Sequence, residues 1–175
     1  MAVYAVVLAA GASSRYGTEP PKQVQLLPKV LAALGESSVD GVVVVSGAHP
    51  LSVESVRCPD WERGPGASLR WGLAALPPEA EAAVVVLADG PMLAPEAIDR
   101  IVAAWREGAG DVVAASYGGN RGHPVVLDRG MWAQIPDEGA RALEPALVPC
   151  DDLGSPGDVD VPEDLRRRVG GAGAE

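Results

Sequence analysis

The feature that most constrains the fold is a series of short apolar runs that alternate with amphipathic stretches. The runs begin at Val3, Gly41, Ala82 and Asp111 and read VYAVVLA, GVVVVSG, AAVVVLAD and DVVAAS. Continuous Val-rich runs of this length are typical of strands that are buried on both faces, as in a parallel sheet. Amphipathic stretches between such strands predict helices that cover the sheet, so we expect an α/β layered domain.

Three of the intervening stretches carry apolar residues at helical spacing and end at glycine or proline. The three sets are Leu27, Val30, Leu31 and Leu34 before Gly35; Leu69, Leu73 and Leu76 before Pro77; and Ile98, Ile101, Val102 and Trp105 between Pro95 and Gly108. The last third predicts a strand from His123, a short helix over Met131 to Ile135, a strand from Leu147 and a short helix from Pro162. The 175 residues suit a single domain over 1–169, with 170–175 as a disordered tail.

Charge and composition exclude several classes of partner. The formal net charge is −10, which argues against a nucleic-acid backbone or an anionic membrane surface as partner. No apolar run approaches the ~20 residues of a membrane helix, and the N-terminus lacks the basic region of a signal peptide. Cys58 and Cys150 suggest no disulfide framework, and His49 and His123 make no zinc site. The default expectation is therefore a cytoplasmic protein.

The first candidate motif is VVLAAGASSRYG, from Val6 to Gly17, where an apolar run gives way to small residues. Gly11 accepts positive φ, and a row of N–H groups in such a loop favours an anion. The segment has neither the dinucleotide fingerprint nor the P-loop sequence, which disfavours an NAD-type oxidoreductase. Two interpretations stay open: an anion loop in which Arg15 and Lys22 hold phosphate, or a tight turn with solvated charges and no ligand.

Aspartates in two segments are candidate metal ligands. Asp89 in LADGPM directly follows a buried run, where a carboxylate is costly unless it is paired. Mg²⁺ is commonly held by one or two carboxylates together with phosphates and waters. We favour this role over a turn or N-cap aspartate because Pro91 separates Asp89 from the next helix. Asp158 and Asp160 alternate with valines and share one face, and a metal, a basic partner and helix capping near Pro162 all remain open.

Two polar loops are candidate substrate-binding segments. The segment DWERGPGASLRWGL, from Asp60 to Leu73, has Gly64 and Gly66 before a helix that Ser68 is expected to cap. A base or sugar would fit against such a pliable loop. In GGNRGHPVVL, His123 either contacts a substrate phosphate or, as a lone histidine more often does, plays a structural part.

Taken in order, these segments resemble the molybdenum-cofactor nucleotidyltransferase family, the MobA/MocA-like NTP transferases. LAAGASSRYG with Lys22 is similar to the family signature LA-[AG]-G-x-S-x-R-M-G…K, and LADGPM is similar to L-x-D-Q-P. DWERGPGASLRWGLAAL, GHPVVL and DVDVPEDL resemble the later segments, and DEGARAL matches a stretch of the cytidylyltransferase branch. The resemblance implies a three-layer Rossmann-like nucleotidyltransferase fold with a mostly parallel central sheet.

The resemblance also implies a reaction and a set of residue roles. A nucleoside triphosphate binds with Mg²⁺, the terminal phosphate of molybdopterin attacks the α-phosphorus, and pyrophosphate leaves. The catalytic residues would be Arg15, Lys22 and Asp89, and the metal ligands Asp89 and Asp160. The nucleotide would contact Leu8, Ala9, Ala10, Gly11, Arg15, Lys22, Ser46, Asp60 and Ser68, and His123 stays a candidate for substrate binding.

The identity of the nucleotide is read from LAAG, since the guanylyltransferase branch usually has LAGG. The methyl group of Ala10 leaves less room for a purine, so CTP is favoured over GTP. The segment after Lys22 is shorter than in the family and lacks its usual glycine. The alternatives are a GTP-dependent guanylyltransferase, a transferase with another phosphorylated acceptor, and a non-catalytic protein that delivers nucleotide or cofactor. A molybdoenzyme that receives the cofactor is a further expected partner.

Overall fold

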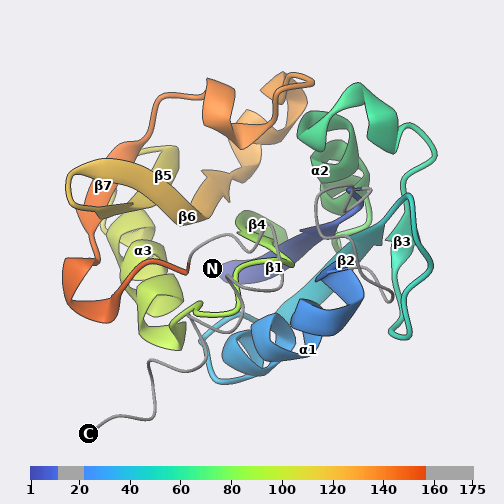
Figure 1. Ribbon diagram of the computed structural model, residues 1–175. Coiled ribbons are helices and arrows are strands. Elements are labelled where there is room, and N and C mark those ends of the chain that lie inside the picture. Colours follow the sequence, from blue (N-terminus) through green and yellow to red (C-terminus); the bar gives the residue numbers. More distant parts are fainter. Residues whose placement is uncertain (12–21, 157–175) are drawn as a thin grey trace, which may run out of the picture.

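One central sheet organises the molecule (Figure 1). The computed structural model describes residues 1–11 and 22–156, and within them seven strands pair in the order β3-β2-β1-β4-β6-β5-β7. The strands are β1 (Ala2–Ala9), β2 (Gly41–Ser46), β3 (Val56–Arg57), β4 (Ala80–Leu87), β5 (Val112–Tyr117), β6 (Asn120–Asp128) and β7 (Ala146–Pro149). The four Val-rich runs are therefore confirmed as β1, β2, β4 and β5.

The sheet is mostly parallel, as expected. Strand β1 pairs in parallel with both β2 and β4, and the pairs β2–β3 and β5–β7 are also parallel. Strand β6 runs antiparallel between β4 and β5. The sequence does not indicate β3, because a strand of only two residues carries no usable periodicity.

Helices cover both faces of the sheet and complete the three-layer α/β fold. The helices are α1 (Lys22–Gly35), α2 (Pro65–Ala74) and α3 (Pro95–Arg106), and the 3-10 turns are η1 (Trp61–Arg63), η2 (Arg129–Gln134), η3 (Ala140–Ala142) and η4 (Asp151–Leu153). All three predicted helices are confirmed, and the short helix near Met131 is η2. The helix expected from Pro162 lies outside the described residues, as does the tail.

One helix-capping prediction is wrong. Helix α2 begins at Pro65 with Gly64 before it, so Ser68 lies inside the helix rather than at its N-cap. Proline at the first helical position suits the helix start, because its fixed φ is helical and its missing N–H costs nothing there. No helix among residues 1–11 and 22–156 is long and apolar enough to span a bilayer.

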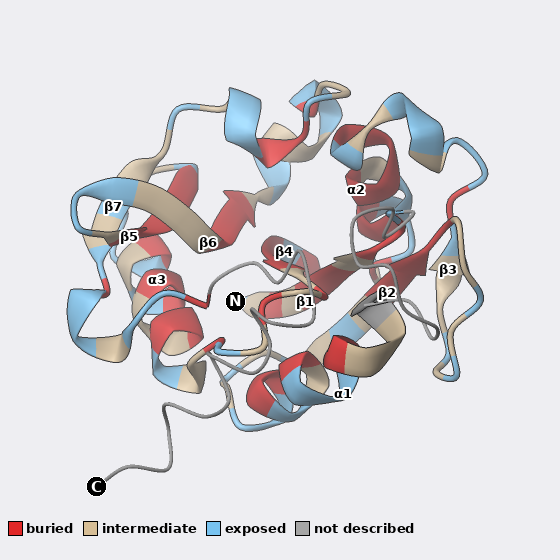
Figure 2. Ribbon diagram, in the orientation of Figure 1, coloured by how far each residue is buried: buried red, intermediate tan, exposed pale blue. Residues whose placement is uncertain are grey.

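Alternating side chains of the strands form two apolar layers, one on each face of the sheet. Val3, Ala5 and Val7 of β1 pack with α1 and α3 on one face, while Val6 packs with α2 on the other. Figure 2 shows the resulting pattern, in which the central strands and the sheet-facing sides of the helices are buried. Burial of each such Val is worth about 1.5–3 kcal/mol, which explains why the Val-rich runs form the centre of the molecule.

The parallel strands β1, β2 and β4 end together at one edge of the sheet. Ala9 is opposite Ser46 in the register of β1 with β2, and Leu8 is opposite Leu87 in the register of β1 with β4. Backbone hydrogen bonds continue past the strand ends, from the Ala88 N–H to the Leu8 carbonyl oxygen over 3.0 Å. Ligands of open α/β sheets bind at this edge, so the segments after β1, β2 and β4 are where a site is expected.

Candidate nucleotide-binding site

A cavity of about 320 Å³ lies at this edge, and we call it the Asp89 cavity. Three parts of the chain form its walls: the end of β1, the end of β4, and the segment of η1 and α2. The lining residues are Leu8, Ala10, Gly11, Trp61, Glu62, Gly64, Pro65, Ser68, Leu87 and Asp89. Small side chains on the β1 wall allow a ligand to approach the backbone closely.

Asp89 is placed by the tight turn that follows β4. The Ala88 N–H is bound to the Leu8 carbonyl oxygen, and the Gly90 N–H donates to the Leu87 carbonyl oxygen over 3.3 Å, so the backbone on both sides of Asp89 is held beside the end of β1. Within the described ranges, no group of three or more His, Cys, Asp and Glu side chains is arranged to hold a metal ion. One carboxylate is nevertheless enough where phosphate oxygens and waters supply the other ligands.

The wall formed by η1 and α2 depends on two glycines. Gly64 has φ +126°, a conformation that side chains rarely adopt, and a Cβ on it would lie 2.6 Å from the Asp137 carbonyl oxygen. A Cβ on Gly66 would lie 1.7 Å from the Pro136 carbonyl oxygen. Both glycines therefore permit close backbone contact with a segment that is about 70 residues further along the chain.

A second cavity, of about 280 Å³, adjoins the first and is called the His123 cavity. Leu87 lines both cavities, and Gly90, next to Asp89, lines the second together with Arg121 and His123. Burial and then the charge of Arg121 lower the pKa of His123 to about 4, and the attraction of Asp89 opposes that shift. His123 is therefore neutral at pH 7, where it offers a hydrogen bond rather than a charge.

The guanidinium group of Arg121 is held by backbone carbonyl groups in and after η3. Its guanidinium group donates to the Ala140 carbonyl oxygen over 2.6 Å and also to the carbonyl oxygens of Leu143 and Arg141. Burial lowers the pKa of Arg121, although a guanidinium stays charged at neutral pH. The sequence does not indicate these contacts of Arg121, because an arginine in a polar loop carries no signal of its partners.

The residues expected from the sequence divide between the described and the undescribed parts of the chain. Leu8, Ala10, Gly11, Ser68 and Asp89 come together around the Asp89 cavity. Arg15 and Asp160 lie outside the described residues, and Lys22 opens α1 with a side chain that also lies outside them.

Three other expected nucleotide contacts do not line the Asp89 cavity. Ala9 is 2% exposed inside β1, and Ser46 is buried with its hydroxyl accepting a hydrogen bond from Ser55 over 3.0 Å. Asp60 lines a separate groove beside α2. These assignments came from matching motifs along the chain, which does not show which neighbours of a motif face inward.

Comparison with known families decides the class of the protein. The sequence model of the MobA-like NTP transferase domain matches residues 5–147. The chain belongs to the MobA-like NTP transferase family. The matched residues of this MobA-like chain include every described wall of the Asp89 cavity.

Solved structures are similar to this NTP transferase over nearly its whole length. Rv0371c from Mycobacterium tuberculosis H37Rv is similar with a TM-score of 0.78 and 27% identity, over 97% of this chain and 99% of that chain. A complex of Rv0371c with manganese, also from M. tuberculosis H37Rv, aligns with a TM-score of 0.73 and 25% identity, over 95% and 97% of the two chains.

A more distant structure shares the fold. The nucleotidyl transferase Mth528 from Methanothermobacter aligns with a TM-score of 0.75 and 19% identity, over 95% of each chain. The comparison with curated proteins gave no significant match. The expected three-layer nucleotidyltransferase fold is thus confirmed, and the protein is a nucleotidyltransferase of the MobA-like family.

Proposed function

We propose that this nucleotidyltransferase transfers CMP from CTP to the terminal phosphate of molybdopterin and releases pyrophosphate. The observation that carries the proposal is the meeting of Ala10, Gly11, Ser68 and Asp89 in one cavity at the carboxyl edge of the sheet. A flat base and ribose would lie against the small residues that follow β1, and the phosphates would extend toward Asp89.

Asp89 is proposed to hold a divalent cation, Mg²⁺, with Asp160 as a second ligand. When bound, the cation supplies positive charge that offsets the charge of the triphosphate. The support for a metal is the carboxylate donor at the cavity wall and the manganese complex of Rv0371c. Arg15 and Lys22 are proposed to bind the triphosphate oxygens, because guanidinium and ammonium groups are the usual phosphate ligands.

The acceptor is proposed to bind in the His123 cavity, next to the Asp89 cavity. A phosphate nucleophile is already largely ionised at pH 7, with a second pKa of about 6. The reaction therefore needs no general base, and His123 would be a weak one because its pKa is lowered to about 4. His123 would orient the acceptor through a hydrogen bond, and catalysis would consist of positioning and charge neutralisation.

The preference for CTP is supported by Ala10, whose position on the cavity wall limits the space for a base. We further propose that residues 1–169 act as one domain in the cytoplasm and that a molybdoenzyme receives the product. A GTP-dependent reaction, another phosphorylated acceptor and a non-catalytic delivery protein are distinguished by the experiment below.

A panel of nucleoside triphosphates, read by thermal stabilisation with and without Mg²⁺, tests the proposal. CTP at 100 times its dissociation constant should stabilise the protein by about 2.7 kcal/mol, and pyrophosphate should be released when molybdopterin is added. Asp89→Asn should abolish the Mg²⁺-dependent part of the stabilisation and the turnover, because the carboxylate charge is lost while the shape is kept.

Asp111→Asn is the matched control, since Asp111 is exposed and precedes β5 at the opposite edge of the sheet. It should leave both readouts unchanged. If the Asp89→Asn variant turned over CTP as fast as the wild type, the proposed role of the carboxylate would be contradicted. Stabilisation by CTP without pyrophosphate release would identify a binding protein instead.

A further inference from the structure

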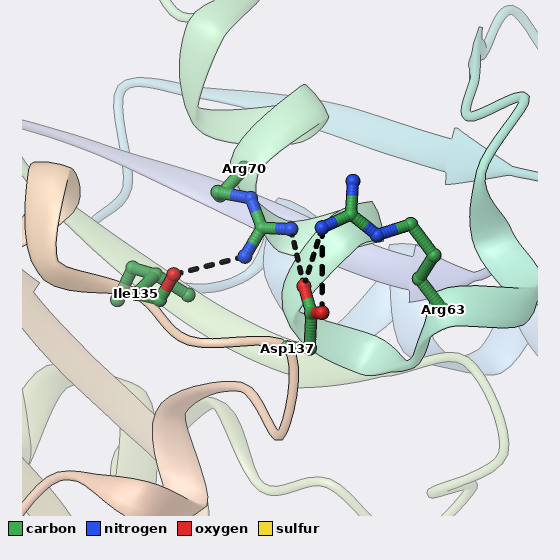
Figure 3. Close-up of polar contacts among 4 residues, drawn as sticks. All are labelled: Arg63, Arg70, Ile135 and Asp137. Atoms are coloured by element: carbon green, nitrogen blue, oxygen red, sulfur yellow. Dashed lines mark hydrogen bonds and ion pairs between the residues drawn. The ribbon is translucent and has the colours of Figure 1, made fainter.

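A cluster of charged side chains includes residues of η1 and α2, the two elements that form one wall of the Asp89 cavity. Figure 3 shows Arg63 from η1 and Arg70 from α2, whose guanidinium groups converge on the carboxylate of Asp137. The Arg70–Asp137 contact is 2.6 Å and the Arg63–Asp137 contact is 3.4 Å. Arg70 also donates to the Ile135 carbonyl oxygen over 2.9 Å.

The backbone at Pro136 and Asp137 also contacts the cavity wall directly. The Gly66 N–H donates to the Asp137 carbonyl oxygen over 2.9 Å, in the first turn of α2. Gly64 and Gly66 have no room for a side chain against Pro136 and Asp137. The segment that ends at Asp137 is therefore packed against the residues that line the cavity from η1 and α2.

In this cluster the carboxylate of Asp137 pairs with the guanidinium groups of both Arg63 and Arg70. The hydrogen bond from Arg70, assisted by Arg63, holds the pKa of Asp137 below its usual range, so the carboxylate is charged at neutral pH. Without that charge, two guanidinium groups would face each other and repel. Because all three side chains are partly exposed, the ion pairs add little to global stability, and the effect of removing the charge falls on the local arrangement of η1 and α2.

We propose that Asp137 is a positioning residue for the nucleotide, which fixes η1 against the first turns of α2 through Arg63 and Arg70. This inference rests on the proposed function, because the wall that it holds is the one against which the base and ribose would lie. Trp61 and Glu62 enter the cavity from η1, and Pro65 and Ser68 enter it from α2. The shape of the cavity therefore depends on the position of η1 relative to α2.

Asp137→Asn tests the inference in a CTP-dependent pyrophosphate-release assay. A displaced wall lowers the fraction of protein that is ready to bind, which weakens binding in proportion to that fraction. A competent fraction of about one tenth raises KM about tenfold and leaves kcat within about twofold, because ground-state and transition-state binding are lost equally. Hydrogen exchange of residues 61–68 should become faster, and this readout needs no nucleotide.

Asp152→Asn is the matched control, since Asp152 forms a comparable pair with Arg100 over 2.7 Å on a different part of the molecule. It should leave KM and the exchange of residues 61–68 at wild-type values. The double variant Arg63→Gln with Asp137→Asn removes the repulsion between the two guanidinium groups and should recover part of the lost affinity.

The outcomes separate the two proposals. A wild-type protein that neither binds nor turns over any nucleoside triphosphate overturns the proposed function and this inference with it. If the wild-type protein turns over CTP and the Asp137→Asn variant has the same KM as the Asp152→Asn variant, only the positioning role is overturned.

Discussion

At the residue scale, the methyl group of Ala10 is expected to set the preference for CTP over GTP. Ala10 lies on the cavity wall and is 6% exposed, so its side chain has no freedom to move away from a larger base. Ala10→Gly should shift the ratio of kcat/KM for CTP to that for GTP by at least about tenfold toward GTP, as one methyl-sized change in a binding pocket does. The ratio is measured by pyrophosphate release.

The ratio is its own control, because general damage lowers both activities together. An unchanged ratio in Ala10→Gly would contradict the steric account of the CTP preference. The sequence was informative at this scale where a residue lies within two positions of a strand end, as Ala10 and Asp89 do, because strand ends meet at one edge. It was less informative for Asp60, since the turn η1 between Asp60 and the cavity sets the direction of each side chain.

At the element scale, the cavity wall formed by α2 depends on the close packing of this helix against β1 and β2. Gly72 makes the approach possible, because a Cβ there would lie 2.4 Å from Val6 Cγ1 and 2.8 Å from Val45 Cγ2. Valine has little rotational freedom with which to give way. Gly72→Ala should therefore lower the free energy of unfolding by about 1–3 kcal/mol, as measured by urea denaturation.

Gly35→Ala is the matched control, since nothing lies within 4 Å of a Cβ at Gly35. It should keep the wild-type stability or add up to about 1 kcal/mol by restricting the unfolded chain. Equal stability of Gly72→Ala and Gly35→Ala would show that α2 does not pack as closely as described.

The elements themselves were largely predictable from the sequence, and the exceptions have physical reasons. Val-rich runs and helical periodicity identified the main strands and helices because burial dominates both patterns. The start of α2 was placed too late, since Ser68 was expected at the N-cap and the glycine at residue 64 precedes a proline start instead.

At the scale of the whole molecule, the sequence predicted the layers but not the order of the strands. The antiparallel insertion of β6 between β4 and β5 brings His123 to the edge that holds Asp89. The contact of Asp137 with Arg63 and Arg70 joins positions about 70 residues apart. Such contacts follow from topology, which local patterns along the chain do not encode.

The central claim is that a nucleoside triphosphate occupies the Asp89 cavity with a cation on Asp89. A crystal structure of the protein with CTP and Mg²⁺ measures this most directly. The account predicts the base and ribose against Ala10, Gly11 and Ser68, with the metal ion bound to Asp89. A nucleotide bound elsewhere, with no metal ion on Asp89, would contradict it.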